Sequence, residues 1–312
     1  MSTALTYPEA IVVGAFQGVT ELFPVSSLGH SILVPALVGG RWARDLNVSR
    51  PESPYLAFIV GLHVATALAL LLFFWRDWLR IIGGFLSSVR DRRVATPDQR
   101  LAWLIVLGTI PVGVSGLLLE HLFRTTLGRP VPAAVFLTIN GVLLYGAERL
   151  RRRSVGSAGS DIGDAKVAPA AGQPQAALAL ASDRRLAGLS VAAGIAIGSA
   201  QVLALLPGIS RSGVTMAAGL LRGLSHEDAA RFSFLLATPV ILAAGALKIP
   251  DLLGPLGKGI GPQVLLGSLA SFLSAYAALR YLSRYFQTRT LTPFAVYCSV
   301  AGLLSLVVLS VR

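Results

Sequence analysis

Ionisable and hydroxyl side chains gather in one short stretch of a very apolar chain, FQGVTELFPVSSLGHS at residues 16–31. Gln17 and Glu21 are four residues apart, so they share one face of a helix. Pro24 ends that helix, and the serines after it can cap a second helix whose first turn carries His30. Helix starts attract anions, phosphate above all. The stretch predicts an anion site with a carboxylate and an imidazole beside it.

A second stretch, LPGISRSG at residues 206–213, interrupts another apolar region. Arg211 places a permanent charge there between Ser210 and Ser212, and a guanidinium suits bidentate phosphate binding. The alternative is an arginine that is paired structurally with a carboxylate. Together the two stretches suit phosphate-ester or diphosphate chemistry, and neither contains a P-loop, a GxSxG elbow or HExxH. His63 and His121 have no such neighbours in the sequence, so we expect both to be structural.

The composition indicates an integral membrane protein. Of the residues, 54% are hydrophobic and 13% are charged, whereas a soluble domain carries about 25% charged residues. The net charge of +12 comes mainly from arginines between apolar runs, which indicates cytoplasmic loops rather than a nucleic-acid partner. The single cysteine, Cys298, excludes a disulfide framework and a cysteine-based metal site. Glu9 and the lack of an N-terminal basic region argue against a cleaved signal peptide.

Spanning a bilayer takes about 20 apolar residues. We predict six spans, at 55–75, 101–119, 132–147, 229–249, 264–282 and 291–310. Three further apolar pieces, 9–23, 28–39 and 187–224, are interrupted, and such breaks survive in a membrane only against protein or a watery cavity. The basic loops lie at 76–100, 148–186 and 280–289. If these loops are cytoplasmic, the first broken region enters from outside and the second from inside.

The two broken regions also align with each other. Residues 14–27 lie over 198–210 with one gap, pairing Gly14 with Gly198, Gln17 with Gln201, Pro24 with Pro207 and Ser27 with Ser210. Paired broken segments point to a binding site near the middle of the membrane. We therefore predict an all-α membrane protein built as an inverted-topology repeat, with halves at 1–153 and 183–312. The small, Gly-, Pro- and Ser-rich stretch 154–182 is expected to be a flexible cytoplasmic linker.

The two motifs resemble those of the bacterial undecaprenyl-diphosphate phosphatases, (E/Q)xxxE running into PVSSxGH, and PGxSRSxxT. Here they run from Gln17 to His30 and from Pro207 to Thr215, and the resemblance covers nearly the whole chain. It implies about six transmembrane and four re-entrant helices. It also implies hydrolysis of the prenyl diphosphate to the monophosphate, which recycles the carrier for peptidoglycan synthesis and confers bacitracin resistance. A divalent cation, Mg²⁺ or Ca²⁺, and a site reached from the outer face of the plasma membrane are expected as well.

With this resemblance, the catalytic residues are expected to be Glu21, His30, Ser27 and Arg211. Arg211 would clamp the diphosphate, and Glu21 would hold the cation or act as general base. His30 would be a general acid or base or the nucleophile, and Ser27 is the other candidate nucleophile. The expected phosphate-binding residues are Gln17, Ser26, Ser210, Ser212, Gly208, Gly213 and Thr215. Because the first motif position is Gln17, Glu21 is the only carboxylate that the motif offers.

Two other function classes remain open at this stage. A transporter or flippase of a lipid phosphate would also use inverted repeats and broken helices. A purely structural membrane protein has no need for Glu21 and Arg211 at membrane depth. The expected partners are a polyprenyl diphosphate and the bilayer, and a homodimer is kept as an alternative to the monomer.

A reporter fused after residue 312 tests the orientation. Because the predicted spans alternate from cytoplasmic basic loops, we expect the C-terminal reporter to be active outside the cytoplasm. A fusion in the 148–186 loop serves as the control and should read inside. A cytoplasmic signal from the C-terminal fusion would contradict the predicted topology.

Overall fold

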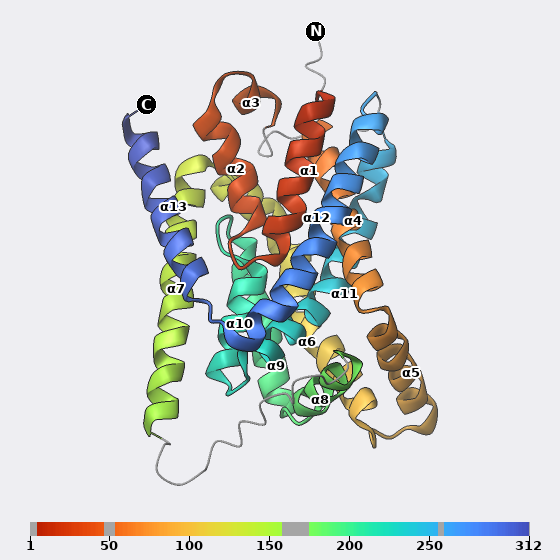
Figure 1. Ribbon diagram of the computed structural model, residues 1–312. Coiled ribbons are helices and arrows are strands. Elements are labelled where there is room, and N and C mark those ends of the chain that lie inside the picture. Colours follow the sequence, from red (N-terminus) through yellow and green to blue (C-terminus); the bar gives the residue numbers. More distant parts are fainter. Residues whose placement is uncertain (1–4, 47–53, 158–174, 255–258, 312) are drawn as a thin grey trace.

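The computed structural model describes residues 5–46, 54–157, 175–254 and 259–311, and over these ranges the chain is helical without a β-strand (Figure 1). The elements are α1 (Tyr7–Leu22), α2 (Ser27–Val38), α3 (Gly40–Asp45), α4 (Pro54–Phe73), α5 (Trp75–Asp91), α6 (Pro97–Leu127), α7 (Pro130–Ser157), α8 (Gln175–Ala187), α9 (Val191–Ser199), the 3₁₀ helix η1 (Ala200–Leu205), α10 (Arg211–Leu221), α11 (His226–Leu253), α12 (Gly261–Thr288) and α13 (Thr292–Val311). The predicted all-α class is confirmed. Helices satisfy their own backbone hydrogen bonds, which lipid cannot do.

Over the described residues, five helices are long and apolar enough to cross a membrane, namely α6, α7, α11, α12 and α13. The remaining predicted span, 55–75, falls on α4, which continues into α5 after a bend of 84°. A second bent pair joins α8 to α9 and η1 at 103°, and counting both pairs as spans gives seven. The chain is therefore a multi-pass membrane protein, and every predicted run lies on a helix.

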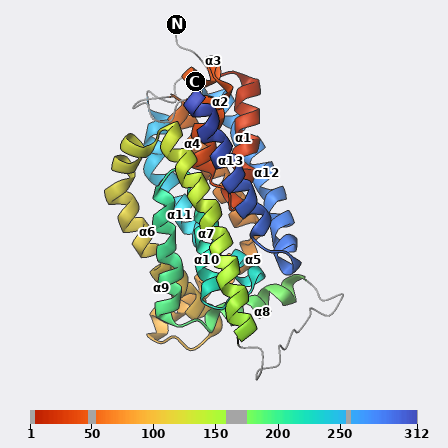
Figure 2. The same cartoon turned by 90° about the vertical axis from the view of Figure 1, so that its left-hand side faces the viewer.

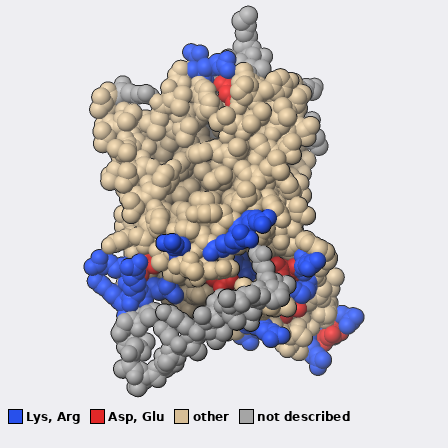
Figure 3. All heavy atoms as spheres, viewed as in Figure 1, with Lys and Arg blue, Asp and Glu red and all other residues tan. Residues whose placement is uncertain are grey.

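The surface separates an apolar belt from charged ends. Lys, Arg, Asp and Glu side chains gather mainly at the end formed by α5, α8 and the last turns of α7, which we call the basic end (Figure 3). Both termini lie at the opposite end (Figure 1). Large apolar side chains such as Leu117, Leu118 and Leu265 are 72%, 74% and 72% exposed. Such exposure is costly in water and favourable in lipid.

Helix α5 lies inside the predicted 76–100 loop, so that part of the loop prediction is wrong. Its exposed apolar side chains recur at helical spacing and are Trp75, Leu79, Ile82, Leu86 and Val89. On its protein-facing side, Arg80 bonds Asp98 of α6 at 3.0 Å and Asp183 of α8 at 2.6 Å. An amphipathic helix of this kind suits a membrane surface. The segment carries too many charges to read as a span, which is why the helix was missed.

The two broken regions enter the molecule from opposite ends, as predicted. α1 runs from the end that holds both termini to the middle, and α2 returns to that end (Figure 1). α9 and α10 lie in the half nearer the basic end (Figure 2). The non-helical residues between α1 and α2, and between η1 and α10, are therefore brought to mid-height inside the bundle.

Each broken region packs against a helix of the other half. Gly14 of α1 lies so close to α12 that a Cβ there would stand 2.2 Å from the Gly267 carbonyl oxygen. Gly198 of α9 lies against α6 in the same way, and its Cβ would stand 2.1 Å from the oxygen of Gly108. Gly14 and Gly198 are the residues that the repeat alignment pairs. Small residues of this kind let membrane helices approach closely, and the reciprocal contacts agree with the predicted inverted repeat.

The predicted linker at 154–182 is longer than the structure allows. Helix α7 continues to Ser157 and α8 begins at Gln175, so both ends of the predicted linker are helical. The apolar residues of ALALAS give α8 its helical pattern and were read as part of a low-complexity stretch. The rest of the predicted linker, 158–174, lies outside the described residues.

Candidate active site

Two serines start the helices that follow the breaks. The Ser26 hydroxyl accepts a hydrogen bond from the Gly29 N–H at 3.2 Å, and the Ser210 hydroxyl accepts one from the Gly213 N–H at 3.2 Å. Each cap satisfies a donor that the first helical turn leaves free. The caps pair SSLG with SRSG, so Ser26 corresponds to Ser210. The predicted pairing of Ser27 with Ser210 is therefore one residue out of register.

Corrected in this way, Ser27 is the counterpart of Arg211, the first residue of α10. Ser27 and Arg211 both contact the same carboxylate, that of Glu21. The backbone around the caps is unusual as well, because Ser26 has a φ of 69° and Gly208 a φ of 115°. Positive φ is favourable for glycine and strained for serine, and such strain is found mainly at functional sites.

Glu21 and Arg211 form an ion pair between the two halves of the chain. Arg211 Nη2 donates to Glu21 Oε1 at 2.8 Å, and the two side chains are 13% and 7% exposed. The structural alternative for Arg211, pairing with a carboxylate, is thus also observed. However, its second terminal nitrogen, Nη1, is buried and has no hydrogen-bond partner among the described residues. Leaving a charged donor unpaired costs about 1–3 kcal/mol or more, and a phosphate oxygen is an acceptor of the kind that Nη1 requires.

The other oxygen of Glu21 collects three polar neighbours. The Ser27 hydroxyl donates to Glu21 Oε2 at 2.5 Å, and Gln17 Nε2 donates to it at 3.1 Å. His63 Nε2 lies 3.4 Å from the same oxygen. The helix face predicted for Gln17 and Glu21 is therefore observed. The structure brings Gln17, Glu21, Ser27 and Arg211 together as one cluster.

His63 belongs to this cluster, so the expectation that it has no such neighbours is wrong. Its Nδ1 lies 2.9 Å from the Ile59 carbonyl oxygen, which can only accept, and its Nε2 also lies 3.3 Å from Gln17 Nε2. The contact depends on packing of α4 against α1, which nothing near position 63 in the sequence reveals. An ionisable residue in the middle of the 55–75 span was the only available signal. The side chain of His121 is not among those that the structure describes.

His30 points to a different group of residues. Its Nδ1 lies 2.7 Å from the Ser26 carbonyl, so Nδ1 carries the proton, and its Nε2 accepts a hydrogen bond from the Tyr297 hydroxyl at 2.8 Å. The Phe16 ring packs edge-on against the imidazole at 5.6 Å. Among the described residues, no hydrogen bond joins His30 to Glu21 or Arg211. The predicted site is therefore split, with His30 facing α13.

The remaining predicted binding residues hold the breaks together. The Ser210 and Ser212 hydroxyls both donate to the Phe23 carbonyl, at 3.4 and 3.1 Å. Thr215 donates to the Arg211 carbonyl at 2.7 Å. Gly208 packs against α7, where a Cβ would stand 2.4 Å from the Ala133 oxygen. These contacts give the residues a structural role, and their contact with phosphate stays a prediction.

Asn140 of α7 connects the two breaks and was missed in the sequence. Its Nδ2 donates to the Pro24 carbonyl at 3.2 Å, and its Oδ1 accepts from the Ser210 N–H at 3.0 Å. The side chain is fully buried and also contacts Cys298 Sγ at 3.3 Å. One amide therefore satisfies a freed backbone group in each break. A polar residue within the apolar 132–147 span was the signal that could have identified it.

The carboxylate cluster offers few ligands for the expected divalent cation. Over the described residues, no group of three His, Cys, Asp or Glu side chains could hold a metal. Glu21 supplies the one carboxylate and Ser27 a hydroxyl. Mg²⁺ commonly binds through one or two carboxylates together with substrate phosphates and water. The described residues thus fit a cation that takes part of its ligands from a bound phosphate group, and not one enclosed by protein ligands alone.

Comparison with known proteins gives matches along almost the whole chain. Residues 10–304 match the family described as bacitracin resistance protein BacA. An undecaprenyl-diphosphatase of Mycolicibacterium paratuberculosis is 70% identical over 312 residues, covering 100% of both chains. Its counterpart in Mycobacterium avium is 69% identical over the same length and coverage. An undecaprenyl-diphosphatase 1 of Frankia casuarinae is 54% identical over 365 aligned positions, covering 98% of each chain.

Replacement of Asn140 by alanine tests its role between the breaks. The change leaves the Pro24 carbonyl and the Ser210 N–H buried without a partner, so we expect the free energy of unfolding to fall by about 2 kcal/mol or more. Thermal unfolding of the purified protein in one detergent measures this loss. Ile139→Ala, at an exposed position on the same helix, is the control and should change little. Equal melting temperatures for Asn140→Ala and the wild type would show that the Asn140 side chain does not stabilise the two breaks.

Proposed function

The chain belongs to the bacitracin resistance protein BacA family, and we propose that it hydrolyses undecaprenyl diphosphate to undecaprenyl phosphate and phosphate at the Glu21–Arg211 pair. This is the activity in the names of relatives that share up to 70% of its residues over its whole length. Recycling of the cell-wall lipid carrier, and the resistance to bacitracin that the family name records, follow from that reaction. The observation that carries the proposal is the buried Nη1 of Arg211, for which the described part of the chain offers no hydrogen-bond partner.

Arg211 provides the charge clamp in this proposal. Its Nη2 is held by Glu21, which fixes the guanidinium plane and leaves Nη1 to donate to an oxygen of the terminal phosphate. Phosphoryl transfer depends mostly on positioning and on stabilising charge that spreads over the phosphoryl oxygens. An arginine that is held in place in a buried site positions the phosphoryl group and stabilises its charge without reorganising during the reaction.

Ser27 is the nucleophile that the geometry favours. Its hydroxyl already donates to Glu21 Oε2, which is the arrangement of a nucleophile and its base. Ser27 Oγ attacks the terminal phosphorus, its proton passes to Glu21, and the bond from phosphorus to the bridging oxygen breaks, releasing undecaprenyl phosphate. Water then attacks the phosphoserine, giving inorganic phosphate and restoring the hydroxyl. His30 is the less favoured nucleophile because its Nε2 is occupied by Tyr297.

A divalent cation, Mg²⁺ or Ca²⁺, is part of the proposal. Glu21 and Ser27 would hold it together with oxygens of the substrate, since only one carboxylate is present in the cluster. When bound, the cation would neutralise charge on the diphosphate. Gln17 would orient the Glu21 carboxylate through its 3.1 Å hydrogen bond.

We place the basic end in the cytoplasm of a bacterial cell and the site toward the outer face of the plasma membrane. The support is the concentration of arginines at one end and the entry of α1 and α2 from the other (Figure 1). The reporter fused after residue 312 tests this orientation. The homodimer stays a prediction.

Hydrolysis by the purified protein is the direct test of the function. We expect phosphate release from a long-chain prenyl diphosphate with Mg²⁺ or Ca²⁺ present. Arg211→Ala and Glu21→Gln should lower kcat by on the order of 100-fold or more, because each removes charge stabilisation or proton transfer in the transition state. Arg222→Ala, at an exposed arginine just after the same helix, should keep the wild-type rate. If the wild type releases no phosphate, the proposed hydrolysis is refuted. Transport of the lipid without hydrolysis would favour a flippase.

Trapping of a covalent intermediate identifies the nucleophile. Rapid quenching in denaturant during turnover, followed by peptide mass spectrometry, should show phosphate on Ser27, and the label should survive acid as a phosphate ester does. Ser27→Ala should abolish the label, whereas His30→Ala should retain it. An acid-labile label on His30 would overturn the assignment. Release of phosphate without any label would indicate direct attack by water.

A further inference from the structure

An open, basic groove lies on α12 near the basic end, away from the ion pair between the breaks. It has a volume of about 500 Å³, and its main side chains are Arg280, Tyr281, Arg284, Tyr285 and Arg289. Basic side chains form a patch on the front of the molecule, above the main charged end, in the region where α12 crosses in Figure 1 (Figure 3). Arg280 and Arg284 are four residues apart on α12, and so are Tyr281 and Tyr285, so the two pairs form neighbouring rows. Arg289 directly follows the last residue of the helix.

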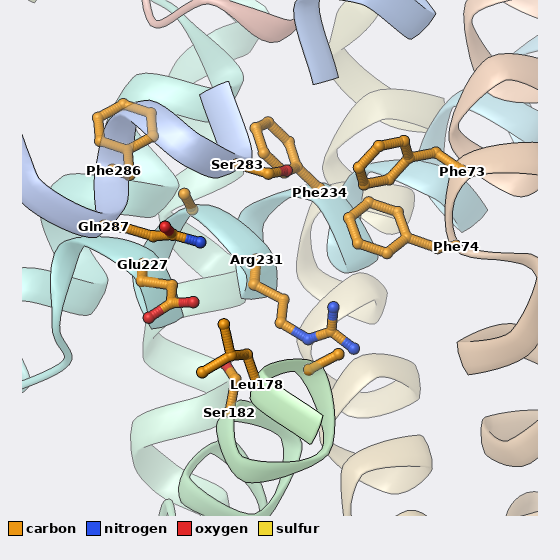
Figure 4. A pocket seen from close by; sticks show the side chains of 12 residues that line it. Phe73, Phe74, Leu178, Ser182, Glu227, Arg231, Phe234, Ser283, Phe286 and Gln287 are labelled. Atoms are coloured by element: carbon orange, nitrogen blue, oxygen red, sulfur yellow. The ribbon is translucent and has the colours of Figure 1, made fainter. Parts of the chain in front are cut away.

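The groove differs from the ion-paired arginine sites at this end because the described residues leave its charge without a counter-ion. Arg80 and Arg231 both bond Asp183, and Arg185 bonds Asp228. Arg231 also lies beside Phe74 in a separate pocket (Figure 4). In the described part of the chain, by contrast, no carboxylate forms an ion pair with Arg280, Arg284 or Arg289, and all three are exposed. Three unpaired positive charges around one hollow favour an anion.

The same face of α12 continues away from the arginines as an apolar track. Leu269 and Leu273 are 55% and 58% exposed, and the next residue at this spacing, Ala277, is exposed and lines the groove. Together with Tyr281 and Tyr285 they form one ridge with a spacing of four residues. Tyrosine suits the boundary between lipid and water, because its ring is apolar and its hydroxyl is polar. The surface thus presents a basic hollow joined to a strip that suits an acyl chain.

We propose that this groove binds the phosphate headgroup of an anionic phospholipid of the bilayer, whose acyl chain lies along Leu269 and Leu273. A polyprenyl phosphate has a similar combination of phosphate and apolar tail. The groove is open and bounded on one side by a single helix, so it selects by charge and by contact with the bilayer. These features suit an abundant two-chain lipid at the membrane surface.

One aromatic contact links the groove to the first break. The Tyr281 ring stacks on Phe23 with centroids 6.0 Å apart and an angle of 2° between the rings. Phe23 also supplies the carbonyl that accepts from Ser210 and Ser212. A lipid that restrains Tyr281 therefore acts on a residue of the first break that bonds to the second. Because a ligand bound only to the folded state raises its stability, lipid binding should raise the melting temperature.

Native mass spectrometry of the full-length protein tests the site. The delipidated protein is mixed with phosphatidylglycerol or with phosphatidylcholine, and retained lipid is counted. We expect wild type to retain phosphatidylglycerol and to gain thermal stability from it, with little effect of phosphatidylcholine. The triple variant Arg280→Gln, Arg284→Gln, Arg289→Gln should weaken phosphatidylglycerol binding by on the order of 100-fold. Tyr281→Leu should lower lipid retention and the gain in melting temperature together, because the gain follows from binding to the folded state.

A charge-matched variant separates the groove from general basicity. Arg93→Gln, Arg152→Gln and Arg222→Gln together remove the same charge at exposed positions outside the groove, and this control should bind phosphatidylglycerol like wild type. Equal losses in both triple variants would overturn the site. So would retention of a polyprenyl phosphate by the groove without retention of phosphatidylglycerol. Neither result depends on hydrolysis, so the proposed reaction is tested separately.

Discussion

Glu21 and Arg211 carry opposite charges in the middle of an apolar bundle, where neither charge is stable alone. They come from opposite halves of the chain and meet at 2.8 Å. Because a side chain is short relative to the width of a helix bundle, the end of α1 that carries Glu21 and the start of α10 that carries Arg211 must lie next to each other. The close crossings at Gly14 and Gly198, with backbone in contact with backbone, bring the two ends together.

Breaking a helix inside a membrane frees backbone groups that need new partners. Here the partners are few and each serves more than one purpose. Ser26 and Ser210 cap the new helices, and Asn140 bonds one freed group in each break. The same short segments then present Ser27 and Arg211 to Glu21 as the first residues of α2 and α10. The same short segments therefore satisfy the freed backbone groups and place the side chains of the charged cluster.

The sequence was sufficient for the spans, the two breaks and the meeting of Glu21 with Arg211, because each depends on local apolar runs or on a motif. It was not sufficient for His63 and Asn140, whose roles arise only when α4 packs on α1 and α7 packs on both breaks. The split of His30 from Glu21 was also hidden. Both lie in one motif, but the imidazole leaves α2 toward Tyr297, and that direction is set by α13. Helix α5 was missed because its charges mask a regular apolar face.

The two breaks share a backbone design but contribute different chemistry. The caps align Ser27 with Arg211, so this position holds a hydroxyl in one half and a guanidinium in the other. The repeat alignment also places Gln17 over Gln201. The buried Oε1 of Gln201 has no hydrogen-bond partner within the described ranges, whereas Gln17 donates to Glu21. A symmetric pair of identical halves would place two carboxylates or two arginines together, and like charges at this depth repel strongly. Divergence of the halves is therefore what allows one clamp and one base to occupy a single site.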